Sequence, residues 1–243
     1  ALGTPALESL ILTAGESVNV FGSMLFDTRG ANGASSLQRL VLGAPAIYGY
    51  GAAGDTATIR ANEFVWAGSL TADPATIIPG YDTPAAPGGA VLDRLGDGTL
   101  AITADVIRFD AAPYTMATSL VPAHRLVLGF SSVTLDAARQ VTAKGTGSLA
   151  VHHTVTGYEG GQGWQYSGGD LSVRTPLVTS EAGAEMGMRA GGAMTVQGTG
   201  AAAGAWLQRV GGASATGAAT GVTAGAVSAR ASTGAGLAAA MVK

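Results

Sequence analysis

Short apolar runs separated by small and polar residues recur along this chain. Residues 125–153 show the pattern most clearly, with apolar runs at 126–128, 133–135 and 149–151. Each run is too short for a helix and has the length of a short strand. The breaks between the runs contain glycine, which adopts backbone angles that other residues resist. The pattern therefore predicts a strand, a tight corner and another strand in succession.

The same pattern returns along most of the chain. In each copy a small residue precedes alternating apolar positions and a polar residue, and a second apolar run follows. Alternation within a run turns one face of the strand inward. Uneven spacing between the copies is typical of a β-helix, a solenoid with insertions between its coils. The copies occupy residues 9–21, 57–66, 98–109, 132–141, 169–178 and 192–197.

Two segments interrupt the pattern and are predicted to be side loops. Residues 67–97 contain four prolines, which cannot donate a hydrogen bond to a sheet, and residues 154–168 are rich in glycine. We therefore expect a β-helix body over residues 1–210 with side loops at 67–97 and 154–168. Residues 211–243 consist mostly of Gly, Ala, Ser and Thr. They form either further thin coils or a loosely ordered tail.

The composition of the chain limits the classes of partner and cofactor that it could bind. Only 12% of the residues are charged, the net charge is −3, and the lysines and arginines are scattered, which disfavours nucleic-acid binding. No apolar run approaches the roughly 18–20 residues that span a bilayer, so we expect no membrane span. The chain has no cysteine, which excludes disulfides and thiolate metal sites. We expect no cofactor.

The strongest candidates for recognition are three aromatic residues in the second side loop. Tyr158, Trp164 and Tyr166 are separated by glycine and polar residues. Exposed aromatic rings with polar neighbours are typical of sites that stack on sugars or hold a protein partner. The alternative is that these rings cover the core beneath the loop.

Catalytic and metal sites receive less support. His152 and His153 are adjacent, so on a strand they face opposite sides and make poor joint ligands, and His124 is distant in sequence. The carboxylates Asp105, Asp110 and Asp136 fall near predicted coil corners. A glycosidase needs two carboxyl groups roughly 5–10 Å apart, and Asp105 and Asp136 would meet that need if their coils stack. Turn capping is the simpler interpretation of these residues, and we predict neither catalytic nor metal-binding residues.

Three longer stretches resemble a known family. They are GTLAITADVIRFD (98–110), LVLGFSSVTLDAARQVTAKGTGSLAV (126–151) and GGDLSVRTPLVTSEAGAEMGMRAGGAMTVQG (168–198). Their ordered succession is similar to large bacterial exoproteins of the filamentous haemagglutinin type. The resemblance implies a right-handed parallel β-helix, export by two-partner secretion, and a role as a surface adhesin or secreted filament.

The expectation is therefore an all-β chain, folded as a right-handed parallel β-helix (solenoid) with loop excursions. Its expected role is structural or adhesive, without catalysis, in a secreted or cell-surface bacterial exoprotein. We expect it to be an internal segment whose ends contact further coils of the same polypeptide. Its external partner would be a protein or glycan of a host or neighbouring cell. The alternatives are a β-helix polysaccharide lyase or glycoside hydrolase, and an oligomeric tail-spike-like structural protein.

Overall fold

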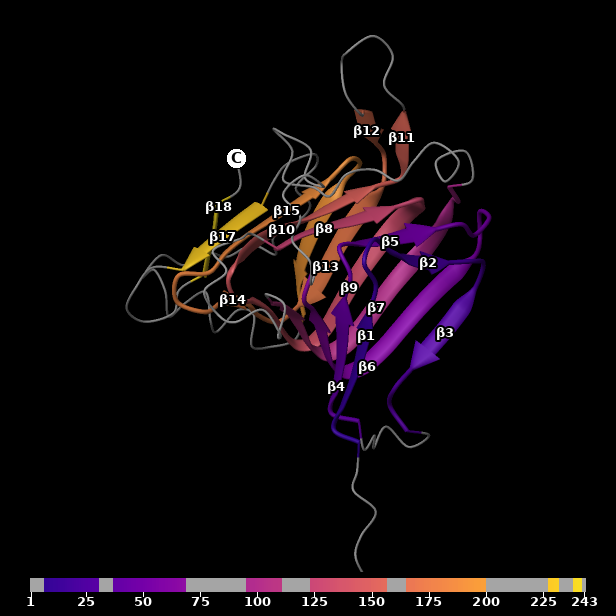
Figure 1. Ribbon diagram of the computed structural model, residues 1–243. Coiled ribbons are helices and arrows are strands. Elements are labelled where there is room, and N and C mark those ends of the chain that lie inside the picture. The colour runs from indigo at the N-terminus through magenta and orange to yellow at the C-terminus, as the bar shows by residue number, and fades with distance from the viewer. Residues whose placement is uncertain are drawn as a thin grey trace, which may run out of the picture.

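The computed structural model is all-β in the part of the chain that it describes (Figure 1). That part comprises residues 7–30, 37–68, 95–110, 123–156, 165–199, 227–231 and 238–241. Most of the predicted side loop 67–97 lies outside these ranges, as do the first and last residues of the chain. Within the described ranges no helix has the length and apolarity needed to cross a membrane.

The larger sheet, here called sheet A, has nine strands whose pairings are all parallel. Two short strands, β3 and β14, lie beside parts of β6 and β9, outside the main strand order. In order across the sheet the strands are β1 (Ser9–Thr13), β4 (Arg39–Gly43), β6 (Thr56–Trp66), β7 (Gly98–Phe109), β9 (Phe130–Ala143), β13 (Asp170–Thr175) and β16 (Met194–Gly198), with β3 (Met24–Asp27) and β14 (Val178–Ser180) at the side.

The second sheet, sheet B, has seven strands. Five of them pair in parallel. Strand β17 pairs with β15 in antiparallel orientation, and β18 pairs with β17 in the same way. A separate two-stranded hairpin, β11 (Thr154–Thr156) and β12 (Gln165–Ser167), projects beyond the sheets (Figure 1). The order in sheet B is β18 (Ala238–Met241), β17 (Val227–Ala231), β15 (Glu185–Ala190), β10 (Thr146–His152), β8 (Ala123–Leu128), β5 (Ala46–Gly49) and β2 (Val18–Val20).

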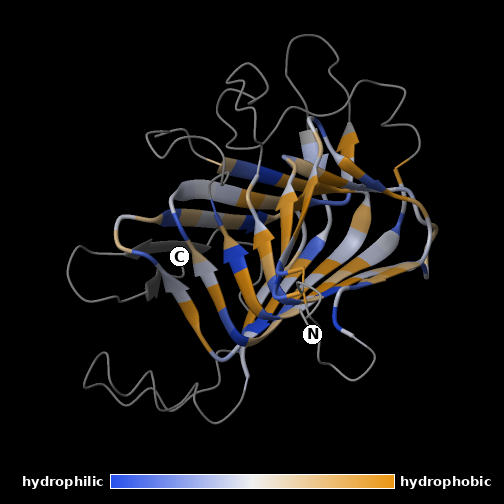
Figure 2. Cartoon of the chain, turned by 60° about the horizontal axis from the view of Figure 1, so that its bottom comes forward, coloured by the Kyte–Doolittle hydropathy of each residue, from blue (hydrophilic) through white to orange (hydrophobic). Residues whose placement is uncertain are grey.

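The two sheets share one apolar core. Side chains alternate along each strand, so every second residue faces the other sheet, and Figure 2 shows the resulting change of hydropathy along the strands. Sheet A contributes Ile102 and Leu135 to this core, and sheet B contributes Val127 and Leu149. Fully burying side chains of this size stabilises a fold by about 1.5–3 kcal/mol each, so the shared core holds the sheets together.

The predicted repeats align in space. Leu100 of β7 lies opposite Val133 of β9, which lies opposite Leu171 of β13, which in turn lies opposite Met194 of β16. All four side chains are buried in the shared core. The recurring sequence pattern therefore marks equivalent positions on neighbouring strands of sheet A.

Glycine forms the corners on either side of β9, as the sequence predicted. Gly129 and Gly145 both have a φ of +80°, in the left-handed region that favours glycine. Gly129 also lies so close to Gly49 of the neighbouring strand that a Cβ atom would overlap the carbonyl oxygen of Gly49. These corners carry the chain from sheet B into sheet A and back.

The expected right-handed parallel β-helix is wrong. The described strands form two parallel sheets with a separate hairpin and no closed solenoid. Among the described residues between β6 and β7, none belongs to a strand of sheet B. Several strands are also longer than expected: β6, β7 and β9 contain 11, 12 and 14 residues.

The physical reason lies in the small residues of the repeat. In the sequence pattern a break follows the polar position, and a second apolar run begins after it. In the structure, Ala104 and Ala137 are buried in the core within continuous strands. The polar residues before them, Thr103 and Asp136, face each other on the outer side of sheet A. The alternation of buried and outward-facing residues therefore continues through the predicted break.

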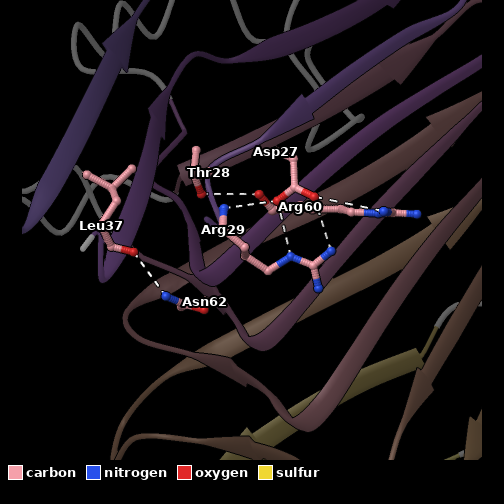
Figure 3. A network of polar contacts seen from close by, with 6 residues as sticks. All are labelled: Asp27, Thr28, Arg29, Leu37, Arg60 and Asn62. Atoms are coloured by element: carbon pink, nitrogen blue, oxygen red, sulfur yellow. Dashed lines mark hydrogen bonds and ion pairs between the residues drawn. The ribbon is translucent and has the colours of Figure 1, made fainter. Parts of the chain in front are cut away.

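Polar contacts fix β3 to the neighbouring strand β6 (Figure 3). The Asp27 carboxylate accepts hydrogen bonds from the backbone N–H and guanidinium of Arg29 and lies 3.8 Å from Nη1 of Arg60. The Thr28 backbone N–H and hydroxyl both donate to the Arg60 carbonyl oxygen. The Arg29 hydrogen bonds hold the pKa of Asp27 below its usual range. These contacts hold the C-terminal end of β3 against β6.

Candidate binding surface

Of the three predicted binding residues, the structure describes Tyr166, whereas Tyr158 and Trp164 lie outside the described residues. Tyr166 belongs to β12, paired with Val155 of β11. The base of the predicted side loop 154–168 is therefore a β-hairpin.

The hairpin returns to the sheet through Gly168 and Gly169, which have φ values of +62° and +84°. A Cβ atom on Gly169 would lie 2.7 Å from the backbone nitrogen of His153. This close approach fixes the base of the hairpin against the end of β10, because a larger residue would push the two segments apart.

Tyr166 packs on the face of sheet B that points away from the shared core. Its ring centroid lies 4.9 Å from that of His152 on β10. The half-buried Tyr166 side chain covers a second, smaller apolar cluster. Tyr166 therefore covers a buried patch, as in the alternative interpretation of the sequence. The buried members of the cluster are Ala46, Tyr48, Leu126, Leu128, Ala150 and Val155.

His152 is buried in this cluster without a polar partner. Its side chain is 7% exposed, and neither Nδ1 nor Nε2 has a hydrogen-bond partner among the described residues. Burial, with a smaller contribution from the charge of Arg189, lowers the pKa of His152 from its ordinary 6.5 to about 4. The imidazole is therefore neutral at physiological pH and behaves as a flat, weakly polar ring.

An exposed aromatic pair that sequence reasoning missed lies at the opposite end of the same face. The rings of Phe21 and Tyr50 stack with centroids 4.9 Å apart and planes inclined by 15°. Phe21, which follows β2, is 73% exposed, and Tyr50, which follows β5, packs against the cluster below Tyr166. Tyr48 is buried between these two ends and interacts electrostatically with both Tyr50 and Tyr166.

We call this row the aromatic strip; it consists of Phe21, Tyr50, Tyr48, Tyr166 and His152. The Phe21 ring is open to solvent, Tyr50 and Tyr166 are half-buried, and Tyr48 and His152 are buried. Burial raises the pKa of both Tyr48 and Tyr50, so their phenol groups stay protonated. The strip therefore offers one solvent-facing aromatic platform, supported from behind by packed rings.

Acidic and hydroxyl groups flank the exposed end of the strip. The Asp55 carboxylate accepts hydrogen bonds from the Ser23 hydroxyl, at 2.6 Å, and from the Ala52 N–H, at 2.7 Å, and these bonds lower its pKa. Asp55 also lies against Gly22 and Gly51, the residues that follow Phe21 and Tyr50. The platform thus has a negatively charged, hydrogen-bonding border.

The three histidines do not form a common site. His124 Nδ1 lies 2.8 Å from the Ser148 hydroxyl, and His153 Nε2 lies 3.1 Å from an Asp97 oxygen. His152 and His153 contact different groups, as expected for adjacent strand residues. No group of three or more His, Asp or Glu side chains in the described ranges could hold a metal ion.

The carboxylates considered for catalysis lie on or near sheet A. Asp136 sits on the outer face of β9, 3.5 Å from Arg174 of β13. Asp105 is exposed on the adjacent strand β7, at a register irregularity, and Asp110 follows the end of that strand. Asp136 is thus in register with Thr103, not with Asp105, and Asp136 is engaged by an arginine.

A second ion-pair row connects strands that are distant in sequence. Glu63 accepts hydrogen bonds from Arg39, at 2.7 Å, and from Arg108, at 3.0 Å, and Arg108 also reaches Glu181 at 3.1 Å. Partial burial raises the pKa of Glu63, but the two arginines outweigh this effect and leave it below its usual range. These charges neutralise one another along the sheet.

Arg125 is a buried charge with a structural role. It is 1% exposed and donates hydrogen bonds to the carbonyl oxygens of Trp66, Asp110 and Ala123. Its guanidinium also lies 5.3 Å from the centroid of the Phe109 ring. Burial lowers the pKa of Arg125 from 12.5 to about 9, and the charge of Asp110 opposes this shift. Arg125 therefore stays charged at neutral pH and binds the ends of β6 and β7.

Comparison with known proteins assigns no family to the chain. The resemblance to filamentous haemagglutinin-type exoproteins remains a prediction from the sequence. No protein-family model matches the sequence, and neither the curated proteins nor the solved structures contain a significant match.

Proposed function

We propose that this chain is a non-catalytic structural and adhesive segment of a secreted or cell-surface bacterial exoprotein. In this proposal the two-sheet body is the rigid support, and the Phe21–Tyr50 end of the aromatic strip is the adhesive site. The observation that carries the proposal is the exposed Phe21 ring stacked on Tyr50.

Phe21 supports this role because its exposure is costly without a ligand. Leaving a side chain of this size in water forgoes about 1.5–3 kcal/mol of burial free energy. The stacked Tyr50 ring holds Phe21 in one orientation, so little conformational entropy is lost when a flat ligand face covers it. An oriented ring of this kind favours ligands with a flat apolar face.

The polar border narrows the class of ligand. Sugar rings combine an apolar face of C–H groups with hydroxyls around the edge, which matches a ring bordered by Asp55 and Ser23. Glu16 adds a negative charge close enough to raise the pKa of Tyr48. Two carboxylates repel anionic sugars, so the proposed ligand is a neutral glycan.

The test is binding of the whole chain to immobilised neutral oligosaccharides of glucose, galactose and N-acetylglucosamine, with sialylated oligosaccharides as the charged comparison. We expect binding to at least one neutral class. Phe21→Ala should weaken that binding about tenfold or more, equivalent to about 1.4 kcal/mol.

The matched control is Leu25→Ala. Leu25 is 62% exposed and, like Phe21, follows β2 in the chain, but it belongs to β3 and lies outside the aromatic strip. Equal losses in the two variants would show that general stickiness, not the strip, causes binding. Absence of binding to every neutral oligosaccharide would refute the glycan assignment.

A further inference from the structure

Strand β1 is an open edge of sheet A in the part of the chain that the structure describes. It pairs with β4 on one side, and no described strand pairs with the other. The Ala14 N–H donates to the Gly43 carbonyl, and the Glu8 carbonyl accepts from Arg39. Hydrogen bonds alternate along a strand, so the even-numbered residues bond to β4. Ser9, Ile11 and Thr13 therefore direct their backbone groups outward.

The side chains of this edge are apolar on both faces of the sheet. Leu10 and Leu12 stand in register with the core residues Leu40 and Leu42. Ile11 stands in register with Val41, which belongs to a small buried cluster on the outer face with Val65 and Ala67. Ile11 and Leu12 are nevertheless 37% and 39% exposed.

Natural edge strands are commonly protected by charged residues, proline or a bulge. Strand β1, with the sequence Ser-Leu-Ile-Leu-Thr, has no charged residue and no proline. Of the large exposed apolar residues in the described ranges, Ile11 and Leu12 belong to β1 and Leu7 lies just before it, while Phe21 and Leu25 lie elsewhere. An unprotected apolar edge with free backbone groups fits one kind of partner, another β-strand.

The sequence of β1 is self-complementary. When two copies run antiparallel and are centred on Ile11, each serine faces a threonine, each Leu10 faces a Leu12, and Ile11 faces its own equivalent. The same register places Glu8 opposite Ala14, so the carboxylates do not meet. The outward backbone groups of Ile11 then form a hydrogen-bonded pair with those of the second copy.

We propose that two copies of this chain associate through their β1 strands, antiparallel about a twofold axis at Ile11. Sheet A then continues from one copy into the other. Leu10 and Leu12 join the two cores, and the outer apolar clusters around Ile11 merge. The interface is isologous, so it closes as a dimer and does not propagate.

The lack of cysteine allows a direct test by disulfide cross-linking. In the proposed register the Cα atoms of the two Ile11 residues are about 5.5 Å apart, within the usual range of about 4.4–6.8 Å for a disulfide. Two Ser9 residues would be separated by four residue steps, roughly 13 Å at about 3.3 Å per step. Ile11→Cys should therefore cross-link under mild oxidation, and Ser9→Cys, the matched control, should not.

Light scattering during size-exclusion chromatography supplies the second measurement. The unmodified chain should elute as a dimer, and Ile11→Lys, which places two ammonium groups face to face, should shift it to monomer. Leu25→Lys, at an exposed apolar position outside β1, should leave the dimer intact. A monomeric unmodified chain, open-ended polymers, or equal cross-linking through positions 9 and 11 would overturn the proposal.

Discussion

Lowering the pH should destabilise this protein through one residue, His152. The imidazole is buried beside Tyr166 in an apolar cluster, and neither ring nitrogen has a hydrogen-bond partner among the described residues. The positive charge of Arg189 also disfavours a second positive charge on His152. A proton on His152 is therefore much less stable in the folded chain than in the unfolded chain.

The size of the effect follows from the pKa of His152, about 4 in the folded state against an ordinary 6.5. At about 1.4 kcal/mol for each pKa unit, the full contribution is about 3 kcal/mol. Because the folded pKa is depressed, this stability is complete above pH 6.5 and is lost as the pH falls towards 4. Between pH 7 and pH 5 the expected loss is about 2 kcal/mol.

The assay is urea unfolding at pH 7, 6 and 5 for the unmodified chain and for His152→Phe, which keeps the ring contact with Tyr166 but cannot titrate. The variant should lose about 2 kcal/mol less than the unmodified chain over this range. His124 and His153 are present in both proteins, so their contributions cancel in the comparison.

Other titrating groups do not interfere with this comparison. The carboxylates with lowered pKa values, Asp27, Asp55 and Glu63, have ordinary values of 3.8, 3.8 and 4.5. Their stabilising effect is lost below this pH window. His153→Gln serves as the control, since His153 is partly exposed and pairs with Asp97. If His152→Phe and the unmodified chain lose the same stability between pH 7 and pH 5, the burial argument is wrong.

Two other substitutions test the packing. Arg125→Met leaves the buried carbonyls of Trp66, Asp110 and Ala123 without their donor, and it should lower the free energy of unfolding by about 3 kcal/mol or more; a loss below about 1 kcal/mol in urea unfolding would contradict the assigned role. Gly147→Ala brings a Cβ atom into overlap with the Ala123 backbone and should cost about 1–3 kcal/mol. Gly15→Ala, where nothing lies within 4 Å, should stay within about 0.5 kcal/mol; equal melting temperatures for these two alanine variants would show that strand spacing at Gly147 is not restrictive.

Much of the local structure was predictable because it depends on local patterns. Alternation of apolar residues located β6, β7, β9, β13 and β16 of sheet A, and glycine located the corners at positions 129 and 145. These features follow from chemistry within a few residues of each site.

The assembly of the strands into two sheets, and the exposed aromatic pair, depend on pairing between strands that are far apart in the sequence. An alanine within alternating residues has the same sequence signature at a corner as in a buried strand, so the pattern does not reveal that β7 and β9 continue through Ala104 and Ala137. Phe21 meets Tyr50 only because β2 pairs with β5 through Val20 and Gly49. Tyr166 was identified from its glycine-rich surroundings, but its packing against His152 depends on how the hairpin folds back onto sheet B.

We propose that a rigid two-sheet body presents the aromatic strip to a neutral glycan. Mapping aromatic NMR shifts during titration with the neutral oligosaccharide bound most tightly tests this claim most directly. We expect the largest chemical-shift changes at Phe21 and Tyr50, and no change at the buried core rings of Phe64 and Trp66. Shifts that leave Phe21 and Tyr50 unaffected, or that spread through the core rings, would contradict it.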